Sequence, residues 1–254
     1  MKKNLYYKTM FRRHNRFKEF VYNFFRGICS IPRLLLEVFV RRNLGERYFS
    51  FSTAMLMAFI LFIVPMIVVD YYPYAKQWSF WGFWGRFLTW YIYVGGFIYM
   101  CIQRRREVSR LPSVFDFGRY SLSTGSYQAF FTKYIIGGRT VDIRLTETII
   151  EPAFFGLIGL ALMIIGQPVG FLILICAICY SLSYFATYWQ GDNFIMDKID
   201  EMILNEEYVN AFVDGMDPDD TRGVRYYGRA PVDPEVRRQM VDSIIVDTDF
   251  VEAK

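Results

Sequence analysis

Histidine is almost absent from this chain of 254 residues, since His14 is the only one and arginines flank it. A histidine-based catalytic triad or a histidine metal cluster therefore cannot be assembled. Cysteine is also scarce, with four residues, of which Cys176 and Cys179 have CxxC spacing inside an uninterrupted apolar run. A zinc site needs four ligands and a redox pair needs an accessible thiolate, so we expect these two cysteines to serve packing. We expect no metal and no cofactor.

Motifs that bind nucleotides or calcium are also missing. The chain contains neither a P-loop signature nor a GxGxxG sequence, which argues against nucleotide-driven work. The aspartates that begin at Asp217 resemble a calcium loop, but Arg222 and Gly228 occupy the positions that require Gly and Glu. The basic N-terminus is not followed by the short apolar core and cleavage site of a signal peptide. No nucleic-acid partner is predicted.

Charge is absent from residues 152–191, forty consecutive positions. This stretch consists of two apolar runs that are interrupted only around Gln167 and Pro168. A membrane helix takes about 20 residues, and lipid offers no partner for an open backbone. The pattern predicts two membrane helices joined by a tight turn.

A second pair of apolar segments precedes this stretch, at Phe51–Val69 and at about Phe83–Ile102. The short connection between them is rich in Tyr and Trp, as expected for an interfacial aromatic belt. We therefore predict an all-α integral membrane protein with four transmembrane helices in two hairpins. We also expect amphipathic N-terminal helices and a cytoplasmic helical C-terminal tail, in which Asp233 caps a last short helix.

The distribution of charge predicts the orientation. Residues 1–50 contain 12 basic and 3 acidic side chains, residues 103–150 contain 8 and 4, and residues 190–254 contain 7 and 16. By the positive-inside rule the N-terminus and the central loop lie in the cytoplasm, and four spans return the tail to the same side. A bacterial inner membrane fits this layout best. The predicted parts are 1–50 (basic interfacial segment), 51–102 (hairpin 1), 103–147 (cytoplasmic loop), 148–190 (hairpin 2) and 191–254 (acidic tail).

The basic segment has helical periodicity. Residues 17–28 place phenylalanines and other apolar side chains on one helical face and charges elsewhere, and residues 33–42 form a second helix after Ser30 and Pro32. We favour contact of both helices with an anionic membrane surface. The alternative is that both pack on the protein's own cytoplasmic part.

Three local signals refine the predicted spans. Pro65 removes one backbone hydrogen bond and is expected to kink the first span. Gly156 and Gly159 would allow a second helix to approach closely. Thr148 and Glu151 have capping-box spacing, which predicts that the third helix begins there.

We predict that this protein is a non-enzymatic subunit that anchors or scaffolds a multi-protein assembly in the membrane, as in secretion or conjugation machinery; the resemblance is one of layout alone. Its partners would be the lipid bilayer and other proteins, which would bind residues 103–145 and 190–254, and we also consider a homo-oligomer. One alternative is an oligomeric channel or transporter. Another is a membrane-embedded enzyme that acts on lipid through Arg139, Arg144, Glu147 and Glu151. The interaction candidates are the aromatic residues Phe20, Phe24 and Phe25 and the charged residues Arg104, Arg105, Arg106, Arg139, Arg144 and Glu151.

Overall fold

The structure of the protein is a computed structural model that describes residues 3–4, 6–7, 10, 16–71, 80–108, 120–126, 135–136, 139–140 and 142–246. These residues are predominantly helical, and each strand among them has only two residues. The predicted all-α class is confirmed. The chain divides into two compact units, one formed by residues 20–188 and the other by residues 1–19 and 189–254.

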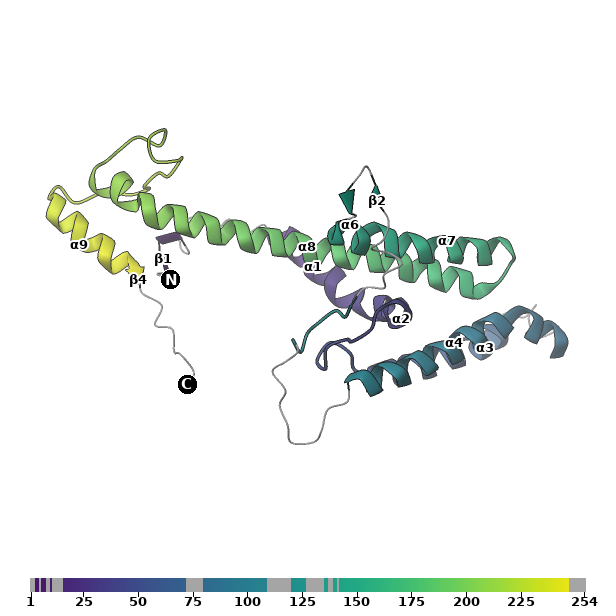
Figure 1. The fold of residues 1–254 in the computed structure, drawn as a ribbon. Coiled ribbons are helices and arrows are strands. Elements are labelled where there is room, and N and C mark those ends of the chain that lie inside the picture. The colour runs from purple at the N-terminus through teal and green to yellow at the C-terminus, as the bar shows by residue number, and fades with distance from the viewer. Residues whose placement is uncertain are drawn as a thin grey trace, which may run out of the picture. The chain divides into compact units, whose positions relative to one another are not determined.

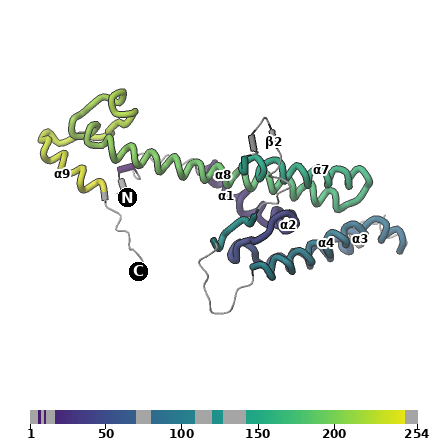
Figure 2. The backbone as a smooth tube through the Cα atoms, viewed as in Figure 1, coloured from purple at the N-terminus to yellow at the C-terminus, as the bar shows by residue number. Residues whose placement is uncertain are grey.

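Figures 1 and 2 show the elements in chain order. The helices are α1 (Arg16–Ile28), α2 (Ser30–Val40), α3 (Phe51–Tyr71), α4 (Phe80–Val108), α6 (Ile143–Leu145), η3 (Thr146–Ile150), α7 (Glu151–Ile164), α8 (Pro168–Tyr208), η4 (Val209–Val213) and α9 (Pro234–Ile244). The strands are β1 (Lys3–Asn4), β2 (Ile135–Ile136), β3 (Arg139–Thr140) and β4 (Ile245–Val246). Antiparallel pairing joins β1 to β4 and β2 to β3.

Helices α3 and α4 form an antiparallel pair. The guanidinium of Arg105, near the end of α4, lies 4.3 Å from the ring centre of Phe51 at the start of α3. Further along the pair, the indole nitrogen of Trp90 donates a hydrogen bond to the carbonyl of Leu61 at 2.8 Å. Since Pro65 lacks the N–H that would reach Leu61 in a regular helix, Trp90 supplies the missing donor.

Helices α7 and α8 form the second hairpin, and the turn predicted at Gln167–Pro168 is confirmed. Helix α7 ends at Ile164, α8 begins at Pro168, and Gly166 between them has φ +80°. The backbones of the two helices come into close contact at Gly159 and Gly170. A Cβ on Gly159 would lie only 2.9 Å from the carbonyl oxygen of Gly170. This close approach agrees with the small residues that the sequence places there.

The start predicted for the third helix is wrong. The helical stretch begins at Ile143, and the Asp142 side chain caps it by accepting a hydrogen bond from the backbone N–H of Arg144. It passes through the π-helical turn η3 before it becomes α7. The capping-box side chains have other partners: the Thr148 hydroxyl donates to the carbonyl of Arg144, and Glu151 pairs with Arg41.

Within the described residues, three helical stretches are long and apolar enough to cross a membrane: Phe51–Val69, Ile143–Ile164 and Pro168–Val213. Helix α4, which contains the predicted second span, is not among them. Its 29 residues are sufficient in length, but Arg86 and several Trp, Tyr and Gly residues lower its hydropathy. The four-span layout therefore stays a prediction.

Helix α2 lies between the two hairpins (Figure 1). On one side it packs against α4, where the hydroxyl of Tyr93 donates to the carbonyl of Leu35 and the Nε of Arg104 donates to that of Val38. On the other side Arg33 donates to the hydroxyl of Ser183 in α8 at 2.8 Å. Helix α2 is thus part of the protein core, in agreement with the alternative that it packs on its own chain.

The smaller unit has a core of its own. Buried Tyr208, Phe212 and Val241 belong to this core, which joins the end of α8, η4 and α9. Helix α9 begins as expected, because Asp233 caps it by accepting from the backbone N–H of Glu235 at 2.9 Å. On the preceding loop Arg222 forms ion pairs with Glu206 and Glu207, both at 2.6 Å.

Candidate functional site

The most unusual feature of the larger unit is a buried polar network centred on α2. Arg33, Glu37 and Arg41 recur every four residues, so they share one side of the helix, and all three are buried. They lie beside apolar residues of the same helix, including Leu36 and Val38. The network thus occupies the space between α2 and the α7–α8 hairpin.

Arg41 joins α2 to both helices of that hairpin. Its guanidinium lies 2.9 Å from a carboxylate oxygen of Glu147 and 2.6 Å from one of Glu151, and it donates to the hydroxyl of Tyr184 at 2.5 Å. Tyr180 donates to the same oxygen of Glu151. Two carboxylates and two tyrosines, drawn from three elements, therefore hold one guanidinium.

Glu37 and Arg33 extend the network toward the loop after α2. The two carboxylate oxygens of Glu37 accept from Tyr184 and from Tyr48, each at 2.7 Å. Arg33 donates to Tyr48 at 2.7 Å and lies 3.3 Å from Glu37. The tyrosine hydroxyl groups thus supply hydrogen bonds to buried charged groups.

Burial and neighbouring charges shift the pKa values of two side chains of this network. Desolvation lowers the pKa of Arg41, but the surrounding tyrosines and the carboxylates of Glu37 and Glu151 outweigh it and raise that pKa. The pKa of Tyr48 is raised, first by burial and then by the neighbouring charge of Glu37. Arg41 therefore stays cationic and Tyr48 stays neutral. The network is a fixed set of charges and donors, suited to holding helices together.

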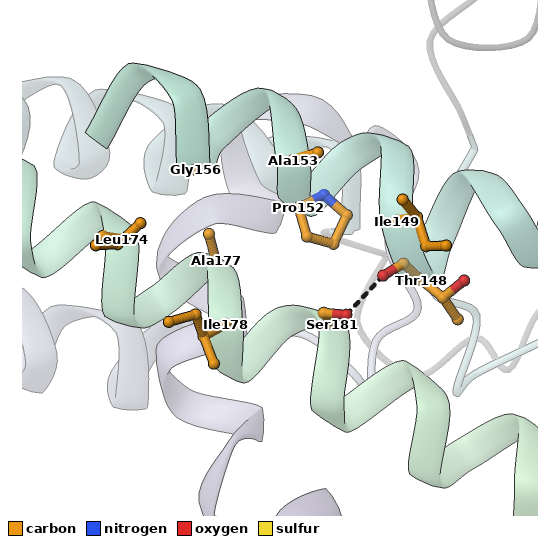
Figure 3. A pocket seen from close by; sticks show the side chains of 9 residues that line it. All are labelled: Thr148, Ile149, Pro152, Ala153, Gly156, Leu174, Ala177, Ile178 and Ser181. Atoms are coloured by element: carbon orange, nitrogen blue, oxygen red, sulfur yellow. Dashed lines mark hydrogen bonds between the residues drawn. The ribbon is translucent and has the colours of Figure 1, made fainter. Parts of the chain in front are cut away.

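A small groove lies beside this network on the α7–α8 hairpin (Figure 3). Its volume is about 300 Å³ and its walls are mostly apolar. The Ser181 hydroxyl, at one end, donates to the carbonyl of Thr148 at 2.7 Å, so a backbone acceptor rather than a catalytic base engages its proton. The groove is lined by Thr148, Ile149, Pro152, Ala153, Gly156, Leu174, Ala177, Ile178 and Ser181.

That hydrogen bond has a structural reason. Pro152 lacks the N–H that would bond to Thr148 in a regular helix, so Ser181 of α8 provides the donor, as Trp90 does for Leu61. Over the part of the chain that the structure describes, no group of three His, Cys, Asp or Glu residues could hold a metal ion. The groove and the network therefore offer packing and charge pairing.

The predicted aromatic candidates lie on α1. Phe20 and Phe24 are exposed, with 66% and 48% of their surface accessible, and Phe25 is half-buried. The exposed pair continues an apolar stripe that includes Phe17 and Ile28, at 78% and 56%. This stripe of α1 is therefore left exposed by the part of the chain that the structure describes.

The arginine cluster at the end of α4 has mixed roles. Arg104 is buried, donates to the carbonyl of Val38 and forms an ion pair with Glu107. Arg105 and Arg106 are exposed, and Arg105 lies over the ring of Phe51. Only the last two have the accessibility that an interaction with headgroups or a partner requires.

The residues of the lipid-enzyme alternative do not form one open site. Arg144 is exposed and stacks over Tyr188 at 5.2 Å, whereas Glu147 and Glu151 are buried against Arg41. The Oε1 atom of Glu151 is buried without a hydrogen-bond partner among the described atoms. Arg139 lies on β3, and its side chain is outside the described part.

The sequence analysis did not identify Arg33, Glu37, Arg41 or Tyr184 as functionally placed. A signal was present, since residues 33–41 contain a charged residue at every fourth position of an otherwise apolar helix. Such spacing marks a single polar side. It does not reveal whether water or a set of buried tyrosines faces that side.

A second exposed apolar stripe lies on the C-terminal half of α8. Ile195, Ile199 and Met202 share one side of the helix and are 56%, 49% and 49% exposed. Acidic residues accompany them, with Asp192 and Glu206 near the same side. This stripe belongs to the tail that the sequence analysis predicted to bind partners.

Comparison of the chain with protein families, with curated proteins and with solved structures finds no match. The class that the fold supports is a mainly helical protein, whose described part contains three helices of membrane-spanning length and apolarity.

Proposed function

We propose that the protein is a non-enzymatic, multi-pass subunit of a bacterial-type inner membrane that anchors a multi-protein assembly. In this proposal α3, α4, the Ile143–Ile164 stretch and the first half of α8 cross the bilayer, with both termini and residues 103–142 in the cytoplasm. The positive charges of the first 50 residues and of the loop support this orientation.

The observation that carries the proposal is the exposed apolar stripe of α8. The 41 residues of this helix extend over about 60 Å, twice the thickness of the hydrocarbon core of about 30 Å. Charged residues begin at Asp192, so the C-terminal half lies outside the hydrocarbon. There Ile195, Ile199 and Met202 remain exposed although no lipid tail reaches them. A protein partner is the occupant that this surface requires.

The acidic charge around the stripe indicates that the partner carries basic side chains. Residues 190–254 contain 16 acidic and 7 basic side chains, and Glu206 lies on the stripe itself. A basic amphipathic helix would cover the apolar side chains and place its cations against these carboxylates. The proposed partner is therefore a helix that is apolar on one side and rich in Lys or Arg beside it.

The test combines membrane fractionation with affinity capture of the full chain in mild detergent. The protein should stay with the membrane after alkaline extraction and should capture a defined set of partners. Ile199→Asn should lower the yield of those partners by about fivefold or more, because interface hot spots contribute at least about 1 kcal/mol.

Asp200→Asn is the matched control, since it introduces the same residue at the next position, which lies away from the stripe and is also exposed. This variant should capture partners as the unsubstituted protein does. Equal losses with both variants would contradict the assignment of the stripe. Release of ions or solutes from liposomes by the purified protein alone would overturn the anchoring function in favour of a channel.

A further inference from the structure

Helix α1 has an apolar stripe that the described residues of the chain leave exposed. Phe17, Phe20, Phe24 and Ile28 follow one another at intervals of three and four residues, so they form one continuous stripe. All four are exposed, by 78%, 66%, 48% and 56%. In a soluble protein the apolar side of such a helix faces the core, and here it does the opposite.

The remaining sides of α1 supply its attachment to the protein. The ammonium of Lys18 lies 4.5 Å from the ring centre of Trp189, and Phe25 is half-buried. At its C-terminal end α1 is followed by buried Cys29 and then by α2, which packs between the two hairpins. Helix α1 is thus connected directly to the bundle that contains the candidate spans.

Charge indicates which kind of surface would cover the stripe. The first 50 residues contain 12 basic and 3 acidic side chains, and Arg26 and Lys18 belong to α1 itself. Basic residues close to a membrane are attracted to anionic headgroups. A helix with aromatic residues on one side and cations on the other has the composition of an in-plane interfacial helix.

We infer that α1 lies in the plane of the membrane, with its phenylalanine stripe at the acyl boundary of the anionic leaflet. This inference rests on the membrane location proposed above. It assigns lipid as the binding partner of α1, whereas the exposed apolar stripe of α8, which acidic residues accompany, is proposed to bind a protein. The stripe of α1 and that of α8 are thereby distinguished by the sign of the charge beside them.

The test measures the contact of single positions with lipid in the full-length protein reconstituted into vesicles. Phe24→Trp reports on the stripe, and Asn23→Trp, an exposed neighbour on another side of α1, is the matched control. Phe59→Trp, 61% exposed in the candidate span α3, is the positive control. The unsubstituted protein provides the background of its five tryptophans, and the quencher is a nitroxide near the top of the acyl chain.

We expect about twofold or more quenching at Phe24→Trp relative to Asn23→Trp in vesicles that contain anionic lipid, because an interfacial helix buries its apolar side about 5–10 Å deep. Quenching at Phe24→Trp should decrease in purely zwitterionic vesicles while that at Phe59→Trp stays constant.

If Phe59→Trp is quenched and Phe24→Trp behaves as Asn23→Trp does, the inference for α1 is overturned and the membrane location stands. If Phe59→Trp itself is not quenched, the proposed membrane location fails. Equal quenching of Phe24→Trp in both lipid mixtures overturns the choice of an anionic leaflet.

Discussion

The indole N–H of Trp90 donates to the carbonyl of Leu61, the acceptor that Pro65 leaves without its helical donor. A buried carbonyl without a donor costs about 1–3 kcal/mol, so this contact compensates for a proline in the middle of an apolar helix. The same relation recurs in the second hairpin, where Ser181 donates to Thr148 and Pro152 is the proline concerned. Each hairpin therefore contains a proline in one helix and the compensating donor in the other.

The first prediction concerns Trp90. Trp90→Phe keeps an aromatic ring but removes the N–H, and we expect it to lower the free energy of unfolding by about 1–3 kcal/mol. In a Pro65→Ala background, where an N–H reaches Leu61, the same substitution should cost much less. Unfolding in mixed detergent micelles measures the four proteins of this cycle, and a cost that is equal in both backgrounds would contradict the compensation.

The second prediction concerns Ser181. Ser181→Ala should reduce stability by about 1 kcal/mol, and Pro152→Ala should largely suppress that loss because it restores the backbone donor to Thr148. Thr187→Ala provides the control, since the Thr187 hydroxyl bonds to the carbonyl of Ser183 in its own helix. If Ser181→Ala proves as mild as the control, the hydrogen bond between the helices contributes little.

The third prediction concerns the buried network. Arg41→Ala leaves Glu147 and Glu151 buried without their shared cation, and we expect a loss of about 3–5 kcal/mol, seen as a sharp drop in folded protein after extraction. The neighbouring Arg42 has an exposed side chain, so Arg42→Ala should change stability by less than about 0.5 kcal/mol.

Rescue tests the electrostatic origin of the loss. Combining Arg41→Ala with Glu151→Gln removes one of the two unpaired charges and should recover part of the folded protein. No recovery would indicate that Arg41 acts through its packing volume.

The fourth prediction compares two glycines. A Cβ on Gly170 would lie 2.5 Å from the carbonyl oxygen of Gly159, so Gly170→Ala should separate α7 from α8 and cost about 1–3 kcal/mol. A Cβ on Gly95 meets nothing within 4 Å, and Gly95→Ala in α4 should instead be neutral or stabilising by up to about 1 kcal/mol. Unfolding curves of both variants give the comparison, and similar effects at the two positions would contradict the close contact of the second hairpin.

The sequence predicted those features that depend on neighbouring residues. The turn at Gln167–Pro168 follows from two uncharged runs and a helix-starting proline, and the structure places it there. The cap of α9 at Asp233 follows from an equally local pattern. In both cases the residues that decide the structure lie within a few positions of each other.

Features that depend on distant residues were not predicted. Thr148 and Glu151 matched a local capping box, but the carboxylate of Glu151 binds Arg41, which lies 110 positions earlier. The charges of α2 indicated a polar side of the helix. The hydroxyl that donates a hydrogen bond to Glu37, however, belongs to Tyr184, 147 positions later. A periodic pattern reports which residues share a side of a helix, and only the tertiary fold decides what that side meets.

The position of α2 between the two hairpins constrains the order in which the helices can pack while the chain is being synthesised. Arg41 is synthesised 110 residues before Glu151, an interval of about 5–20 s at ordinary rates of translation. Until the second hairpin emerges, Arg41 lacks its partners Glu147, Glu151 and Tyr184, and the first hairpin must receive α2 without these final neighbours. Closure of the bundle is therefore a late event, governed by the last of its helices to leave the ribosome.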